Sequence, residues 1–214
     1  MTMQRPRVLI ADDHTLVAEL CKRLLETEYD VVGIVGNGRK LVRAAADLKP
    51  DVIVVDIAMP ILNGLDAGQQ IKEFLPGVKL VYLTMNPDAE VAAEALRRGA
   101  AGYLLKTCAS TELALAVRHA LRGKTYISRA LSKEAVDCLR WEHKTLVEKE
   151  ERLTERQREV LQLLAEGKVM KEVGAILNLS TRTVAFHKYR IMDELGARSN
   201  ADLVRYAVRN HMVV

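Results

Sequence analysis

The first part of the chain alternates short apolar runs with longer amphipathic runs. Five short runs rich in Val, Ile and Leu have the composition of buried strands, and they are residues 7–11, 30–35, 51–56, 79–84 and 100–106. Five longer runs have helical periodicity, and they are residues 15–28, 38–48, 65–75, 88–99 and 110–123. Gly99 and Gly123 end two of these runs, where a helix C-terminus favours a residue free to take a positive φ. The alternation predicts an α/β fold over residues 1–123, with a five-stranded parallel sheet wound on both faces.

The pattern changes after residue 123. Residues 124–152 are charged and mostly helical in propensity but lack a compact apolar pattern, which predicts a partly helical linker. Residues 153–214 then predict an all-α domain of four short helices, at residues 154–167, 171–179, 181–196 and 200–210. Thr154 followed by Gln157 has the spacing of a capping box, and Ser180 is a favourable N-cap for the third helix.

Composition supports a globular protein and excludes several classes. Hydrophobic residues make up 49% and charged residues 28% of the chain, and the longest apolar runs are too short to cross a bilayer. The N-terminal residues lack the long apolar segment of a secretory signal, so we expect a cytoplasmic protein with no membrane contact. Cys21, Cys108 and Cys138 are widely spaced without a CxxC motif, and we expect reduced thiols without a metal or redox role.

The positive charge lies in the second domain. Basic and acidic residues are equal in number up to residue 123, so the formal net charge of +4 comes entirely from the rest of the chain. Arg182, Lys188 and Arg190 fall between Glu172 and Asp193 with no acidic residue among them. A basic segment suits a polyanion, although three charges on a helix also fit a merely solvated face.

Reactive side chains gather at the ends of the predicted strands. Asp12 and Asp13 close the first strand, Asp56 the third, Thr84 the fourth and Lys106 the fifth. Ligands of an open parallel sheet sit at the carboxyl ends of its strands, so these five side chains should meet there. Three carboxylates repel one another unless a cation is present, and oxygen ligands favour Mg²⁺. Asp56 is then placed to attack a phosphoryl group, with Lys106 neutralising phosphate oxygens and Thr84 hydrogen-bonding the product. Any one strand-end acid alone would be explained by solvation.

Residues 7–122 resemble the receiver domain of two-component response regulators, through "IADDH", "VVDIAMPILNGLD", "VYLTMN" and "GYLLKT". The resemblance implies a flavodoxin-like fold and phosphorylation of Asp56 by a sensor histidine kinase, or slowly by a small phosphodonor. It further implies that Asp13, Asp56 and the backbone carbonyl of Ala58 bind Mg²⁺ while Asp12 assists. Thr84 and Tyr103 match the switch pair of the family, although Tyr103 also fits a half-buried strand aromatic.

The sequence departs from many receivers at Met85, which is bulky where Ala or Gly is common. The hypothesis is that this side chain restricts access to Asp56 and slows phosphorylation by small donors.

A helical wheel of residues 181–196 divides its apolar residues between two faces. Val184, Ile191 and Leu195 form one stripe that should pack inward. Phe186 and Tyr189 fall on the opposite arc, where folding gives no reason for aromatic side chains. A DNA major groove or, alternatively, a protein contact would use them.

Residues 150–211 resemble the LuxR-type helix-turn-helix of the NarL/FixJ regulators. The expected contacts with double-stranded DNA come from the second and third helices of the tail, and they are Lys171, Thr181, Arg182, Ala185, Phe186, Lys188, Tyr189 and Arg190. Many family members carry Lys in place of Ala185, and Met170 replaces a commoner polar residue. The target sequence of better-known relatives therefore does not carry over.

Together these features predict a transcription factor, not an enzyme, that binds DNA as a homodimer when phosphorylated. In the resting state the receiver and linker are expected to occlude the DNA-binding or dimer surface. Leu203, Tyr206 and Ala207 either form an apolar dimer stripe or close the core of the domain. An aspartate-nucleophile phosphohydrolase would want a second acid at Ala58 and would leave the tail unexplained. The remaining alternative is a regulator that acts independently of phosphorylation.

Overall fold

The computed structural model describes residues 5–85, 87–131 and 153–213 and divides the chain into two compact units. The first unit contains, in chain order, β1 (Arg7–Ala11), α1 (Thr15–Leu25), β2 (Asp30–Val35), α2 (Gly38–Leu48), β3 (Val52–Asp56), α3 (Gly64–Phe74), β4 (Lys79–Thr84), α4 (Ala89–Arg97), β5 (Gly102–Leu105), the short 3-10 helix η1 (Lys106–Cys108), α5 (Ala109–Leu121) and β6 (Tyr126–Ile127). The second unit contains α7 (Glu155–Ala165), α8 (Met170–Leu177), α9 (Thr181–Leu195) and α10 (Asn200–Arg209).

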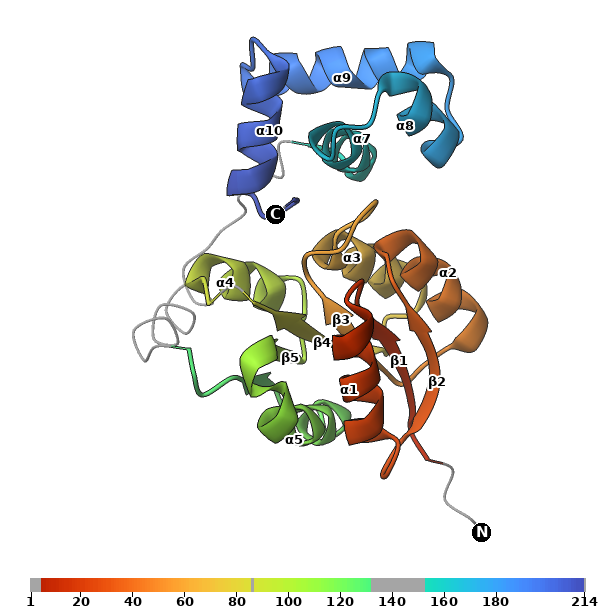
Figure 1. The fold of residues 1–214 in the computed structure, drawn as a ribbon, viewed down its shortest axis with the longest axis vertical. Coiled ribbons are helices and arrows are strands. Elements are labelled where there is room, and N and C mark those ends of the chain that lie inside the picture. Colours follow the sequence, from red (N-terminus) through yellow and green to blue (C-terminus); the bar gives the residue numbers. More distant parts are fainter. Residues whose placement is uncertain (1–4, 86, 132–152, 214) are drawn as a thin grey trace. The chain divides into compact units, whose positions relative to one another are not determined.

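The strands form one parallel sheet in the order β2-β1-β3-β4-β5-β6. Figure 1 shows α1 and α5 together on one side of this sheet and α2, α3 and α4 on the other. β3 is buried along its whole length, since helices cover both of its faces. The predicted doubly wound α/β fold is therefore confirmed, and the strand order reverses between β1 and β3.

The number of strands differs from the prediction. β6 pairs with β5, with Tyr126 opposite Gly102 and Ile127 opposite Tyr103, so residues assigned to a linker extend the sheet. The segment is held further by Ser128, whose buried hydroxyl donates to the Glu112 carboxylate on α5 at 2.7 Å. A two-residue strand carries no periodicity of its own, and its position depends on neighbours that hydropathy does not reveal. The rest of the predicted partly helical linker, residues 132–152, lies outside the described residues.

The helix ends are capped by the residues that the sequence predicts. Gly99 and Gly123 take φ values of 82° and 71°, as expected for helix C-termini. The Thr154 hydroxyl accepts from the Gln157 amide at 3.3 Å, while the Gln157 side chain accepts from the Thr154 amide at 2.7 Å. The Ser180 hydroxyl accepts from the Thr183 amide at 3.0 Å. The starts of α7 and α9 are therefore fixed by the residues that the sequence predicts.

The helical unit has its own apolar core and a close turn between α8 and α9. Val160, Leu163, Val173, Val184 and Ile191 are fully buried within that core. A Cβ atom on Gly174 would lie 2.7 Å from the carbonyl oxygen of Leu179, so the turn brings the backbone too close for any other residue. The turn fixes the direction in which α9 leaves α8.

Among the described residues, no helix is both long enough and apolar enough to cross a membrane. Cys21 and Cys108 are free thiols, and burial raises the pKa of Cys21 to about 11, so it stays protonated. Cys138 lies outside the described residues.

Candidate functional site

The structure brings the predicted charged side chains together at the carboxyl edge of the sheet. The Lys106 Nζ atom lies 2.8 Å from Asp12 Oδ2 and 2.9 Å from Asp56 Oδ2. All three side chains are at most 5% exposed. Thr84 ends β4 directly after Leu83, which pairs with Asp56, so its hydroxyl belongs to the same edge. One ammonium group therefore bridges two buried carboxylates that come from different strands.

Burial and charge pairing act in opposite directions on the pKa values of this group. Burial raises the pKa of Asp56, and the hydrogen bond from Lys106 only partly offsets that rise. Burial by itself would lower the pKa of Lys106, but its contacts with Asp12 and Asp56 outweigh burial and raise it. Lys106 is therefore held in its charged form, and the site retains a fixed positive charge next to the Asp56 carboxylate.

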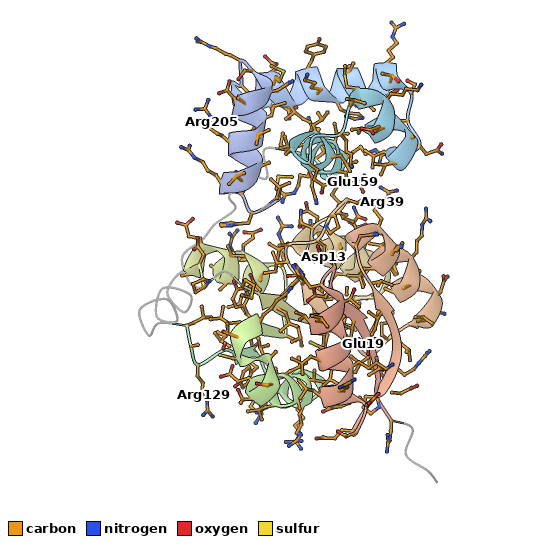
Figure 2. The ribbon with its side chains drawn as sticks, viewed as in Figure 1. Asp13, Glu19, Arg39, Arg129, Glu159 and Arg205 are labelled. Atoms are coloured by element: carbon orange, nitrogen blue, oxygen red, sulfur yellow. The ribbon has the colours of Figure 1, made fainter. Side chains whose placement is uncertain are left out.

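Two further residues complete a set of possible metal ligands. Asp13, labelled in Figure 2, is partly exposed, and its Oδ1 atom lies 2.9 Å from His14 Nδ1. One ligand atom each from Asp12, Asp13, His14 and Asp56 all lie within 4.8 Å of one another. Sequence reasoning missed His14, although the residue stands directly after the paired acids and its position was the available signal.

The loop after β3 holds Asp56 through backbone contacts. The Ala58 amide donates to Asp56 Oδ1 at 3.3 Å, and the Asn63 side chain caps α3 by accepting from the Asp66 amide at 2.9 Å. A Cβ atom on Gly64 would lie 2.1 Å from the Asp56 carbonyl oxygen, a distance that no side chain can occupy. The start of α3 therefore packs directly against the backbone of Asp56.

Thr84 and Tyr103 are in contact in the interior. Tyr103 is 0% exposed, which differs from the half-buried position predicted for it. Burial raises the pKa of the Tyr103 phenol, and a hydrogen bond with the Thr84 side chain acts in the opposite direction. The ring lies inside because α4 covers this face of the sheet, which strand periodicity alone does not reveal. The two residues of the expected switch pair are thus directly linked.

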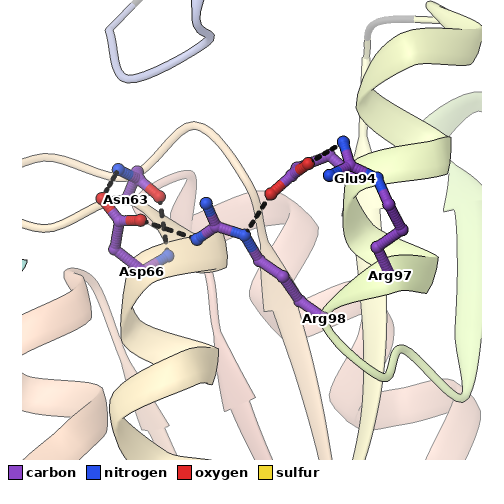
Figure 3. A network of polar contacts seen from close by, with 5 residues as sticks. All are labelled: Asn63, Asp66, Glu94, Arg97 and Arg98. Atoms are coloured by element: carbon purple, nitrogen blue, oxygen red, sulfur yellow. Dashed lines mark hydrogen bonds and ion pairs between the residues drawn. The ribbon is translucent and has the colours of Figure 1, made fainter. Parts of the chain in front are cut away.

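A polar network joins α4 to α3 beside this site (Figure 3). Arg98 Nη1 lies 2.8 Å from Asp66 Oδ1, and Arg98 Nε lies 2.5 Å from Glu94 Oε1, while Glu94 also pairs with Arg97. The Arg98 and Asp66 side chains are 10% and 9% exposed. Because a buried charge is costly without its partner, this ion pair restrains the end of α4 relative to α3. Nothing in the sequence pattern indicated it.

The outward face of α9 carries the aromatic residues that the helical wheel placed there. Phe186 and Tyr189 are 61% and 67% exposed, whereas Val184 and Ile191 on the opposite face are fully buried. Of the remaining residues predicted to contact DNA, Lys171, Thr181, Arg182 and Arg190 are exposed, and Ala185 and Lys188 are half-buried. None of them is buried in the core of the helical unit.

The α10 helix separates its apolar residues between core and surface. Leu203 and Ala207 are 2% and 0% exposed and belong to the core, and Tyr206 is half-buried against it. Of the two roles predicted for these residues, closing the domain core is the one that the structure favours. The exposed apolar residues of α10 are instead Val204 and Val208, one helical turn apart.

Comparison with known proteins agrees with both units. Residues 8–118 match the response regulator receiver domain, and residues 151–207 match the bacterial regulatory proteins of the luxR family. The chain belongs to the NarL/FixJ-type response regulators. Like other members, it combines a receiver with a LuxR-type helix-turn-helix and is a regulator of transcription.

Individual relatives match over nearly the whole chain. The transcriptional regulatory protein LiaR of Bacillus subtilis is 35% identical over 209 residues, covering 97% of this chain and 99% of LiaR. Two solved structures of the response regulator RcsB, both in complexes with DNA, are similar to this chain as well. One is from Salmonella enterica serovar Typhimurium, bound to a promoter in the presence of the phosphomimetic BeF3-, with 27% identity, a TM-score of 0.59 and coverage of 95% and 98%. The other contains two RcsB dimers on two parallel DNAs, with 26% identity, a TM-score of 0.58 and coverage of 96% and 98%.

Proposed function

We propose that Asp56 accepts a phosphoryl group from a sensor histidine kinase, and that this modification switches dimerisation and sequence-specific DNA binding. The observation that carries the proposal is the ammonium group of Lys106 lying 2.8 Å from Asp12 and 2.9 Å from Asp56 in a buried setting. A fixed positive charge beside a carboxylate at the carboxyl edge of a parallel sheet is suited to binding the oxygens of an incoming phosphoryl group.

The donor set fits Mg²⁺. Three carboxylates lie close together with Lys106 between two of them, and oxygen ligands are those that Mg²⁺ prefers. Asp13, Asp56 and the backbone carbonyl of Ala58 would hold the ion, with Asp12 assisting. When bound, the ion supplies further neutralisation of phosphate oxygens.

In the reaction, an Asp56 carboxylate oxygen forms a bond to phosphorus while the bond between phosphorus and the donor nitrogen breaks. Lys106 stabilises the negative charge on the transferred group, and the start of α3 fixes the backbone of the nucleophile because Gly64 packs against it. Thr84 then binds the phosphoryl oxygens, which breaks or rearranges its hydrogen bond with Tyr103. That exchange links the modification to the face of the sheet covered by α4.

The output is binding of a homodimer to double-stranded DNA. A helix-turn-helix places its second helix in the major groove, and two-fold related copies bind two half-sites. The exposed aromatic pair of α9 is suited to contact with base edges, and Arg182 and Lys188 are suited to phosphates. The RcsB complexes with DNA support this use of the domain.

Beryllofluoride, which mimics a phosphoryl group on aspartate, tests the proposal. With Mg²⁺ present, we expect it to bind and to shift the protein from monomer to dimer, as measured by light scattering after size exclusion. The same mixture without Mg²⁺ should leave the protein monomeric. A folded protein that fails to respond would favour the alternative in which the chain acts as a phosphorylation-independent regulator.

Met85 provides a second test, because its side chain is 68% exposed immediately after Thr84. Met85→Ala should accelerate phosphorylation by acetyl phosphate severalfold, since a smaller side chain opens the approach to Asp56. The measurement is the rate of phosphoprotein formation on a phosphate-affinity gel. Met85→Leu, which keeps the bulk, should react like the unmodified protein, and equal rates for all three proteins would remove Met85 as a determinant of access.

A further inference from the structure

The side chain of the histidine beside the acidic cluster neither caps its helix nor joins the apolar core. His14 precedes α1 as its N-cap residue, but its side chain makes no capping hydrogen bond. The ring is 66% exposed and contributes nothing to the apolar core. Its only contacts among the described ion pairs are with two carboxylates, at 2.9 Å from Asp13 Oδ1 and 3.4 Å from Asp12 Oδ1.

The backbone holds this ring over the cluster. The His14 amide donates to Asp12 Oδ1 at 2.9 Å, which closes a tight turn immediately after β1. The turn directs the imidazole Nδ1 atom toward the carboxylates of Asp12 and Asp13. Because the ring is open to solvent on its other side, an ion could reach the cluster without any rearrangement of the fold.

The spacing of these atoms is close to that of one coordination sphere. An octahedral ion with bonds of about 2.1 Å has adjacent ligands about 3.0 Å apart and opposite ligands about 4.2 Å apart. The distances from His14 Nδ1 to Asp13 and Asp12, 2.9 and 3.4 Å, are near the spacing of adjacent ligands. All four ligand atoms, including that of Asp56, lie within 4.8 Å of one another, so small side-chain movements would bring them to one ion. The nitrogen thus occupies the place of a ligand adjacent to Asp13.

We propose that His14 supplies a nitrogen ligand to the divalent-cation site, so that the site binds borderline transition-metal ions such as Ni²⁺ and Co²⁺ in preference to Mg²⁺ because of this residue. The inference rests on the cation site of the proposed function. Imidazole suits transition metals, whereas carboxylate, carbonyl and water suit Mg²⁺. Removing the nitrogen should therefore weaken the binding of Ni²⁺ and Co²⁺ more than the binding of Mg²⁺.

The closest competing explanation is that His14 only orients Asp13 through a hydrogen bond. His14→Asn separates the two roles, because the Asn amide can still donate to the Asp13 carboxylate but offers no imidazole nitrogen to a metal. A positioning role predicts that Asn restores binding of every ion, and a ligand role predicts that the preference for Ni²⁺ and Co²⁺ is lost while Mg²⁺ binding remains.

The test is titration calorimetry of the full chain with Mg²⁺, Co²⁺ and Ni²⁺, together with the visible absorption of bound Co²⁺. Binding at other histidines and cysteines is measured with the Asp13→Asn, Asp56→Asn double variant and subtracted. His187→Asn, on α9 and outside the cluster, is the matched control.

We expect His14→Asn to weaken Ni²⁺ and Co²⁺ binding by about tenfold or more, with a changed Co²⁺ spectrum and a much smaller change for Mg²⁺. Unaltered Ni²⁺ and Co²⁺ affinity in this variant, with Mg²⁺ still bound, would overturn the role of His14 and leave the proposed function intact. Failure of the unmodified protein to bind any of the three ions at Asp13 and Asp56 would overturn both.

Discussion

Asp56→Asn should abolish phosphoryl transfer and every response that depends on it. An amide has neither the charge nor the nucleophilicity of a carboxylate, and the change also removes a proposed metal ligand. In the variant, acetyl phosphate and beryllofluoride should produce no phosphoprotein and no dimer, whereas both should act on the unmodified chain. Phosphate-affinity gels and light scattering measure the two responses. A variant that still dimerises when a phosphodonor is added would contradict the assignment of Asp56.

Loss of function in this variant should not come from unfolding. Because burial raises the pKa of Asp56, the folded state binds its proton more tightly than the unfolded chain does. The free energy of unfolding therefore falls as pH rises from the unfolded pKa of this carboxyl group toward its folded pKa. At neutral pH the ionised Asp56 carboxylate still destabilises the folded state. Lys106 keeps Asp12 as a partner after the change. We expect the thermal unfolding temperature at neutral pH to be unchanged or higher, which circular dichroism can check.

Phe186→Ala and Arg182→Ala should each weaken DNA binding without unfolding the protein. Phe186 is 61% exposed, so truncating it costs little packing, whereas removing a side chain that touches a base edge in the major groove costs about 1–3 kcal/mol. That range corresponds to a fall in affinity of roughly fivefold to 150-fold. Arg182→Ala should weaken binding to all DNA sequences alike. It should also reduce the slope of log affinity against log salt concentration by about 1, because one fewer counterion is released on binding. Fluorescence anisotropy on an oligonucleotide selected from a random pool measures both effects.

The chain provides matched controls for these two variants. The only other phenylalanine is Phe74, which is 46% exposed on α3 of the receiver, so Phe74→Ala removes the same ring from a different unit. Arg122→Ala removes an exposed arginine after α5 in the same way. Both controls should bind the oligonucleotide normally. If Phe186→Ala binds as tightly as Phe74→Ala, the exposed aromatic residues of α9 belong to a protein contact instead.

Much of the candidate site followed from residues at strand ends. Asp12, Asp56 and Lys106 each stand directly after an apolar run, and in a parallel sheet such positions share one edge whatever the details of packing. The exposed face of α9 followed in the same way, because a regular helix assigns every residue to a side once its start is known. These predictions needed only periodicity and connectivity.

Other features depend on contacts that no local pattern contains. His14 faces the carboxylates because of a hydrogen bond made by its backbone, and Tyr103 is fully buried because α4 covers its strand. The pair formed by Arg98 and Asp66 joins residues 32 positions apart. In each case the direction of a side chain is decided by packing and hydrogen bonding that hydropathy does not encode.

The sequence by itself determined the order of strands and helices, the two units and the chemical groups at the edge of the sheet, since apolar periodicity and end-of-strand position are local properties. Only the tertiary structure decided that Tyr126 and Ile127 extend the sheet, that Leu203 and Ala207 belong to the core, and that Lys106 lies between Asp12 and Asp56. The physical reason is that short strands, burial and ion-pair geometry are fixed by packing between separate elements, and their free energy comes from partners brought together only on folding.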